Sequence, residues 1–328
     1  MILVLVETDG QGATLVSREA LTFARGLAGR LGDSVHAVVV GPIDAEVEAP
    51  LVQQLGEQGV AVAHHAVDER LSGYAAAAWA AAVIDVAKAH SAQTVLAAGT
   101  PRGNEILAHV ATRMGVAMAA NVVAADSVQP VQVTRQVVGG TALEEMRLDD
   151  HVAVLSVAGH ACDPAPAEQA TDPELTAYSP TIGAADLRAQ VVRTEAAPAD
   201  DTSALTDARV VVGAGRGVGG SDGFTDLLEL TELLGGSLGV SRVVTSLGWR
   251  PHHEQVGQTG SRISPDLYLA CGISGAIQHW AGCASAKTIV AINTDADAPM
   301  VTKAHYAVIG DLHEIVPAVN AEIRRRQS

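Results

Sequence analysis

Residues Arg209–Gly220 read RVVVGAGRGVGG: a short apolar run and then a glycine-rich turn. A helical pattern follows from about Thr225 to Leu234. This order is typical of the first βα unit of an open α/β sheet. Later in the chain we expect a helix opening near Ser274 and strands at Ser237–Val240, Leu267–Ala270, Thr288–Asn293 and Tyr306–Ile309. Working outward from Arg209–Gly220, the second half is predicted to be a parallel-sheet domain.

The first half shows the same alternation. Apolar runs predict strands at Ile2–Glu7, Val35–Val40, Val60–Val67 and Thr94–Ala98. Helices are predicted at Ser17–Leu31, in a segment ending near Gln58, at Tyr74–His90, and, after a turn at Gly99–Asn104, at Glu105–Met114. Strands that alternate with helices every ~25 to 35 residues imply βαβ units and a largely parallel sheet. Further β-rich runs at Val122–Ala125, Val131–Val138 and Val152–Val157 predict a sheet extension or hairpins, with a turn at Gly139–Gly140.

A polar stretch separates the two halves. Residues Glu195–Asp207 read EAAPADDTSALTD and show no apolar periodicity, which is typical of a linker. We therefore predict an α/β protein with two Rossmann-like open parallel-sheet domains joined by a short linker. The predicted boundaries are 1–195 for a subunit-packing domain with a β-rich extension, 196–207 for the linker and 208–328 for the second domain.

Composition excludes several classes of protein. The 328 residues are 48% hydrophobic, yet no apolar run reaches the ~18 to 20 residues that span a bilayer, and no leader segment precedes the first strand. The three cysteines lack CxxC spacing, so a disulfide framework is not expected. We expect a protein of the reducing cytoplasm. The net charge of -16 argues against nucleic acid as a partner.

The charge is unevenly divided. Residues 1–207 carry 11 basic and 26 acidic side chains, whereas residues 208–328 carry 10 and 11. An anionic ligand is therefore repelled much less by the second half.

The glycine-rich turn is the first candidate binding site. Gly215-x-Gly217-x-x-Gly220 matches the dinucleotide fingerprint, and Arg216 adds a positive charge for a phosphate. A nicotinamide site also needs an acid after the second strand, but Ser241-Arg242 stands there. An ordinary tight turn remains an equal interpretation of this motif alone.

Two further loops combine glycines with polar residues. In Gln255–Gly260, QVGQTG, the glycines allow the close approach of a flat heteroaromatic ring to Gln258 and Thr259. In Cys271–His279, CGISGAIQH, Ser274 falls at the predicted start of a helix, where free N–H groups attract phosphate. A polar surface loop and a packed histidine are the simpler alternatives.

Polar residues also end two predicted strands. Asn293 closes one and Asp311 follows the other, at the sheet edge where ligands bind in open α/β folds, although an Asx turn explains each more simply. No metal site is predicted, because the adjacent pairs His64-His65 and His252-His253 point apart and lack ligand spacing. We also find no catalytic nucleophile motif.

Taken together, the order VGQTG, P-x-LY, GISGAIQH, IVAIN, AP and GDL over about Val210–Val319 resembles the electron transfer flavoprotein α subunit. The first half is similar to this family more loosely, through Gly99–Met114 and TRQVVGG at Thr134–Gly140. The resemblance implies FAD bound mainly by the second domain, in a heterodimer with a β subunit.

The resemblance also implies roles for individual residues. Phosphates would face Arg216, Ser241, Ser274 and Gln278. Arg242 would lie over the isoalloxazine and favour negative charge on the reduced flavin, while Thr259, Gln258 and His279 would approach its N5 and O2 sides. The adenosine end would lie at Asn293 and Asp311, with Leu312 adjoining. The implied cofactor-binding set is completed by Val256, Gly257, Gly275, Ala276 and Ile277.

The function implied by the resemblance is outer-sphere electron transfer rather than substrate chemistry. Donors would be acyl-CoA-type dehydrogenases, as in fatty acid β-oxidation, and the acceptor a membrane quinone oxidoreductase. Three alternatives stay open. One is the α subunit of a bifurcating, NADH-oxidising relative, and another is an NAD-dependent dehydrogenase. The third is an adenine-nucleotide module of stress-protein type in the first half, where no phosphate loop follows Thr94–Ala98.

Overall fold

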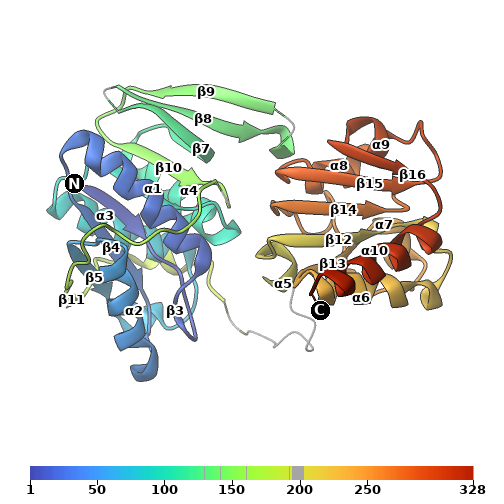
Figure 1. Ribbon diagram of the computed structural model, residues 1–328. Helices are drawn as coiled ribbons and strands as arrows, with labels where there is room; N and C mark the ends of the chain where they lie inside the picture. The colour runs from blue at the N-terminus through green and yellow to red at the C-terminus, as the bar shows by residue number, and fades with distance from the viewer. Residues whose placement is uncertain (129, 141, 160, 192, 194–202, 328) are drawn as a thin grey trace. The chain divides into compact units, whose positions relative to one another are not determined.

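The computed structural model describes residues 1–128, 130–140, 142–159, 161–191, 193 and 203–327. The chain divides into two compact units, each built on its own sheet (Figure 1). Unit 1 comprises Met1–Val137 and Leu143–Glu195, and unit 2 comprises Val138–Ala142 and Ala196–Ser328. The predicted pair of open α/β domains is confirmed. No helix in the described ranges is long and apolar enough to cross a membrane.

Unit 1 is built on a nine-stranded sheet, counted over the described residues, in the order β11-β5-β4-β1-β6-β10-β7-β8-β9. Its strands are β1 (Ile2–Leu5), β4 (Val35–Val40), β5 (Val62–Ala66), β6 (Thr94–Ala98), β7 (Met118–Val128), β8 (Val131–Val137), β9 (Ala142–Leu148), β10 (Ala153–Val157) and β11 (Leu175–Tyr178). A separate antiparallel pair joins β2 (Thr8–Asp9) to β3 (Gly12–Ala13). From β11 through β7 the pairs are parallel, whereas β8 runs antiparallel to β7. The predicted β-rich extension is thus the mixed edge of this sheet.

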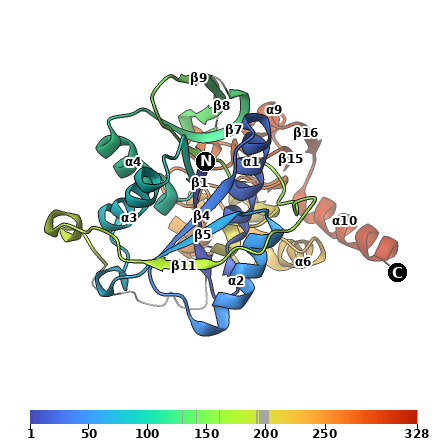
Figure 2. The same cartoon turned by 90° about the vertical axis from the view of Figure 1, so that its left-hand side faces the viewer.

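Helices cover both faces of the first sheet, as Figure 2 shows. They are α1 (Leu15–Leu31), α2 (Ala45–Glu57), α3 (Ala76–Ala89) and α4 (Pro101–Met114). Successive residues of a strand point to opposite faces. In β1, Ile2 and Val4 therefore pack in the core with α1 and α2, and Leu3 and Leu5 pack with α3 and α4.

The predicted turn at Gly99–Asn104 is wrong from Pro101 onward, because α4 begins there. Thr100 caps the helix, its hydroxyl accepting a hydrogen bond from the Gly103 amide at 2.8 Å. Proline suits the first helical position, where its missing N–H costs no hydrogen bond. The prediction treated Pro101 and Gly103 as residues that interrupt a helix, whereas both lie in its first turn.

Unit 2 is built on a five-stranded parallel sheet in the order β13-β12-β14-β15-β16. The strands are β12 (Val210–Ala214), β13 (Ser237–Val240), β14 (Leu267–Cys271), β15 (Thr288–Asn293) and β16 (Tyr306–Ile309). The helices are α5 (Ser203–Thr206), α6 (Thr225–Leu233), α7 (Arg242–Ser246), α8 (Ile277–Cys283), α9 (Pro299–Lys303) and α10 (Leu312–Gln327). The strand that follows β12 in the chain, β13, lies on one side of β12, and the next strand, β14, lies on its other side. A topological switch point therefore lies between β12 and β14.

Several local predictions for unit 2 need correction. The helix expected to open near Ser274 begins at Ile277, so Ser274 lies in the preceding turn. The last helix, α10, was not predicted. Residues 196–202 of the predicted linker lie outside the described residues. The remaining part, residues 203–207, is described and contains α5. Leu205 of α5 is buried in the core of unit 2, which gives this turn of helix a packing role.

Two glycine-rich turns meet at the switch point. The amides of Gly215 and Gly217 donate to the carbonyls of Cys271 and Gly272, at 2.9 and 3.1 Å. A Cβ added to Gly215 would lie 2.1 Å from the Gly272 oxygen, and one added to Gly217 would lie 2.7 Å from the Gly272 Cα. Glycine is required here for the contact between the two turns. By contrast, nothing lies within 4 Å of a Cβ at Gly220, whose φ of 175° is extended.

This difference predicts unequal effects within one motif. Gly217→Ala should destabilise unit 2 by about 1 to 3 kcal/mol, the usual cost of overpacking, because neither backbone can retreat. Gly220→Ala is the matched control and should leave stability nearly unchanged. Scanning calorimetry of both variants measures the effect. Equal transitions for the two would show that the turns do not depend on this contact.

Candidate functional site

The carboxyl edge of the second sheet holds a crevice of about 370 Å³ at the switch point. The turns that follow β12, β13, β14 and β15 all contribute to it. Its lining comprises Arg216, Gly217, Ser241, Val243, Gly272, Ser274, Asn293, Asp295 and Ala298. Four predicted site residues, namely Arg216, Ser241, Ser274 and Asn293, are therefore brought together. Of the other five, Gly217 and Gly272 lie in segments that the sequence analysis singled out. It missed Val243, Asp295 and Ala298, of which Asp295 is the chemically notable one.

Ser241 is the most informative residue of the crevice. It directly follows β13 and is only 8% exposed, yet its Oγ has no hydrogen-bond partner. Although Ser241 precedes α7, its side chain makes no capping hydrogen bond. A buried hydroxyl without a partner is costly, so its presence indicates a polar ligand that completes the site.

Two arginines lie near Ser241. Arg242 follows it in the sequence, and Arg216 lines the same crevice. Arg216 lines the crevice and Arg242 is the first residue of α7, and both are exposed. Within the described residues, no acidic side chain forms an ion pair with either of them. Unpaired guanidinium groups beside a polar crevice are suited to an anion, phosphate above all.

The opposite end of the crevice has a different character. The Asn293 amide donates to the carbonyl of Ile273 at 3.0 Å, which ties the turn after β14 to the end of β15. Its Oδ1 accepts from the amide of Asp295 at 3.1 Å. Asn293 therefore makes the Asx turn that was the simpler explanation, and it also lines the crevice beside the exposed carboxylate of Asp295.

A second group of predicted residues lies in and beside the loop Gln255–Gly260. The amide of Gln258 donates to the carbonyl of Gln278 at 2.7 Å, so this loop packs on the start of α8. It brings Gly257 and Gln258 of the loop against Gln278 and His279 of α8. The other predicted residues of this group are Val256 and Thr259 in the loop, Gly275 and Ala276 before the helix, and Ile277 at its start. Exposed members are Gln258, Thr259, Ala276, Ile277 and Gln278, and the rest are buried.

Gln255 holds this loop and was not predicted as a site residue. It is 2% exposed, and its Oε1 accepts from the hydroxyl of Thr245 at 2.7 Å. Its Nε2 donates to the Thr259 Oγ1 at 3.0 Å, which leaves the Thr259 hydroxyl hydrogen to donate to a ligand. No signal in the sequence marks Gln255, because its burial and its two partners depend on the fold.

His279 is buried rather than open to solvent. Its Nε2 lies 2.8 Å from the hydroxyl of Tyr268, which is fully buried. Burial lowers the pKa of His279 to about 4. The ring is therefore neutral near pH 7.

Asp311 and Leu312 lie outside the crevice lining. The Asp311 side chain accepts from the amide of His313 at 2.9 Å, and its carbonyl accepts from Glu314 and Ile315, so it begins α10. Leu312 is buried beside Gly272.

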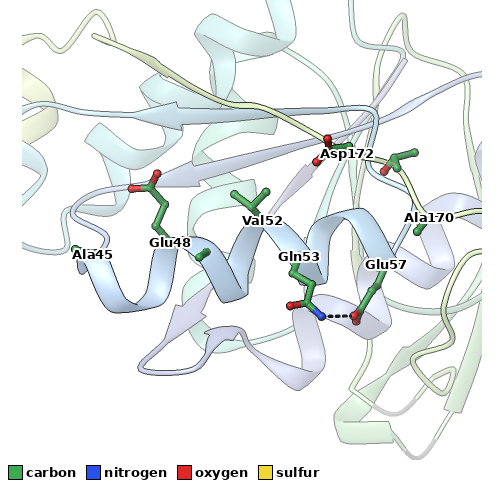
Figure 3. A pocket seen from close by; sticks show the side chains of 9 residues that line it. Ala45, Glu48, Val52, Gln53, Glu57, Ala170 and Asp172 are labelled. Atoms are coloured by element: carbon green, nitrogen blue, oxygen red, sulfur yellow. Dashed lines mark hydrogen bonds between the residues drawn. The ribbon is translucent and has the colours of Figure 1, made fainter.

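A larger hollow, of about 770 Å³, lies over α2 in unit 1 (Figure 3). Its charged lining residues, Glu48, Glu57 and Asp172, are all acidic, and Gln53 donates to Glu57 at 2.9 Å. None of its lining residues carries a buried polar atom without a partner. We assign it no ligand. The smaller crevice in unit 2 is the better candidate site, because it contains the buried Ser241 hydroxyl without a partner and the unpaired Arg216.

Comparison with known proteins gives two family matches. Residues 2–182 match the electron transfer flavoprotein domain, and residues 204–284 match the electron transfer flavoprotein FAD-binding domain. The second match spans the turns after β12, β13 and β14 that form the crevice.

Full-length relatives agree. The chain is 35% identical over 328 residues to electron transfer flavoprotein subunit alpha of Mycobacterium leprae, covering 99% of this chain and 98% of the relative. It is 32% identical over 313 residues to the same subunit of Thermoanaerobacterium thermosaccharolyticum, covering 94% and 93%. It is also 32% identical over 326 residues to protein FixB of Bradyrhizobium diazoefficiens, covering 98% and 88%. The chain therefore belongs to the electron transfer flavoprotein α-subunit family, and its second unit contains the FAD-binding domain of that family.

Proposed function

We propose that this chain pairs with an electron transfer flavoprotein β subunit and carries electrons from acyl-CoA-type dehydrogenases to a quinone oxidoreductase. The partnerless hydroxyl of Ser241, buried in a crevice beside the unpaired Arg216, is the observation that carries the proposal. It supports a bound anionic ligand, and the match to the FAD-binding domain of the family identifies that ligand as FAD. All three cysteines are free thiols, in keeping with the reducing cytoplasm that we propose as the location.

The crevice suits the diphosphate and adenosine parts of FAD. Arg216, Ser241 and Ser274 offer a charge and two hydroxyl groups for the diphosphate. Asn293 and Asp295 offer amide and carboxylate groups for a ribose hydroxyl at the other end. The family resemblance adds three further contacts to this proposal. Gln278 would face the phosphates, and the adenosine end would lie at Asp311, with Leu312 adjoining.

The loop at Gln255–Gly260 suits the flavin ring. FAD, when bound, supplies a ring that accepts and releases electrons. Thr259, fixed by Gln255, would donate a hydrogen bond to a ring nitrogen. The neutral His279 adds no charge, so Arg242 would be the main positive charge near the ring and would stabilise its reduced, negatively charged form.

The lining of the crevice also supports electron transfer without bond-making chemistry. Within the described residues, neither Ser241 nor Ser274 has a side-chain hydrogen bond to a histidine or carboxylate, as an activated nucleophile would. An NAD-dependent dehydrogenase is disfavoured, because Ser241 and Arg242 follow β13 where that site needs a ribose-binding acid.

Counting the flavin in the complex tests the proposal. The chain co-purified with its β partner should show a flavin absorption spectrum and release one FAD per αβ pair. Two FAD molecules per pair would favour the bifurcating, NADH-oxidising relative instead. A colourless complex that binds NAD would overturn the assignment of the crevice.

Removing the charge of Arg242 should lower the one-electron reduction potential of the bound flavin. A charge-assisted contact is worth about 1.5 to 3 kcal/mol. Because about 59 mV corresponds to a tenfold change for one electron, Arg242→Ala should shift the potential by roughly -60 to -130 mV. Arg242→Lys is the control that keeps the charge and should shift it less. A redox titration that gives the same potential for the alanine variant would refute this role.

Ser241→Ala should affect FAD binding and apoprotein stability in opposite ways. Losing the hydroxyl should weaken FAD binding by about 10- to 100-fold, the range for a hydrogen bond to a charged group. The apoprotein should be equally or more stable, because a buried hydroxyl without a partner is removed. Flavin fluorescence titration and calorimetry give the two quantities. Ser246→Ala, at the exposed end of α7, should change neither, and unaltered FAD affinity in Ser241→Ala would contradict the site.

A further inference from the structure

Three histidines from separate segments converge in unit 1, outside the family's FAD-binding domain. His36 lies on β4, His64 lies on β5, and His90 directly follows α3 (these elements are labelled in Figure 2). One ring nitrogen of each lies within 4.8 Å of those of the other two. We call these three residues the histidine cluster.

Strand register explains why two of the rings meet. His64 pairs in register with Val38, and His36 lies two residues before Val38 on β4. The two histidines are therefore diagonal neighbours on one face of the sheet, and Val38 packs in the core beneath α3 and α4. His90 joins them because α3 crosses this face and ends beside them, with ring centroids of His64 and His90 4.7 Å apart.

The spacing of the first pair already suits a shared cation. The Nδ1 of His36 lies 3.2 Å from the Nε2 of His64. Two imidazole nitrogens on one tetrahedral zinc ion, each about 2.0 to 2.1 Å from the metal, lie about 3.3 Å apart. The same distance fits a hydrogen bond between two neutral rings, so the third ring distinguishes the two explanations.

His90 favours the cation. Its ring centroid lies 4.7 Å from that of His64 and 5.8 Å from that of His36. His90 is exposed at the end of α3, whereas His64 is only 7% exposed. We propose that His36, His64 and His90 form a binding site for one zinc-class divalent cation, with the fourth coordination position open to solvent beside His90.

The surroundings of the cluster differ in charge and burial. Burial first, and the neighbouring positive groups second, lower the pKa of His36 and lower that of His64 to about 4. Asp33 acts in the opposite direction on His36 while it pairs with the N-terminal amine at 3.1 Å. Residues 1–207, with 11 basic and 26 acidic side chains, also attract cations.

The neighbouring histidine supplies a matched control. His65 shares β5 with His64 but points to the other side of the strand, and its Nε2 contacts the carbonyl oxygen of Gly41 at 2.7 Å. His64 and His65 point apart, as the sequence predicts for neighbours on one strand. The ring neighbours of His64 come from β4 and from the residue after α3.

A bound cation would crosslink β4, β5 and the end of α3. These segments lie 28 and 26 residues apart at their histidines. The backbones of β4 and β5 are already paired in the sheet, and α3 packs on this face through apolar side chains. The site would thus stabilise unit 1, and it does not depend on the proposed donors and acceptors of electrons.

Titration of the untagged αβ complex with Zn²⁺, and with Co²⁺ as a coloured substitute, tests this inference. One equivalent per α chain should bind, with Co²⁺ giving visible absorption that excess Zn²⁺ removes. Mutating a residue that only supports a metal ligand usually weakens metal binding about 10- to 100-fold. Because His90 is itself a proposed ligand, His90→Gln should weaken Zn²⁺ binding by more than that. His90 is exposed, so this variant should fold, and an unchanged far-ultraviolet circular dichroism spectrum and an unchanged thermal transition verify that unit 1 does.

His36→Gln should weaken binding likewise, while His65→Gln should bind Zn²⁺ as the unaltered complex does. The inference is overturned if no saturable equivalent binds, which would make the cluster a packed, hydrogen-bonded group only. It is equally overturned if His90→Gln and His36→Gln keep full affinity, since the cation would then be bound elsewhere.

Discussion

The contact between two glycine-rich turns at the switch point organises the second unit. Gly215 and Gly217 lie against the backbone of Gly272 so closely that no side chain fits between them. The hydrogen bonds across this contact join the turns after β12 and β14. A crevice then opens beside it toward the turns after β13 and β15, which contribute Ser241, Val243, Asn293, Asp295 and Ala298 to its lining. The glycines thus shape the crevice by packing turn against turn, and we propose that Ser241 and Arg216 contact the cofactor there.

Much of this could be predicted from the sequence, because it depends on local pattern. The strands at Val35–Val40, Thr94–Ala98 and Thr288–Asn293 follow directly from apolar runs between glycine or polar breaks. Four crevice residues follow from the rule that ligands bind at the carboxyl ends of parallel strands. The start of α8 was misplaced because Ser274 resembles a helix cap, whereas the backbone of Gly275, with a φ of 79°, turns the chain first.

What the sequence could not show are contacts between segments that lie far apart in the chain. Gln255 looks like any loop residue until its side chain is found between Thr245 and Thr259. The histidine cluster has no spacing that a motif would recognise, because strand register and the end of α3 bring its members together. Gly220 is a further example. It belongs to the sequence fingerprint, but no atom lies within 4 Å of the position that a Cβ would take there. A motif states which residues are present, and only packing shows which of them are constrained.

We propose that FAD binds at the carboxyl edge of the second sheet. Hydrogen exchange of the αβ complex with and without FAD tests this position most directly. Bound FAD should slow amide exchange in the turns 215–220, 241–244 and 272–276, because ligand contacts suppress local opening. Amides of β1, β4 and β5 should be unaffected. Protection confined to residues 1–137, with none in the three turns, would contradict the account and place the cofactor in the first unit.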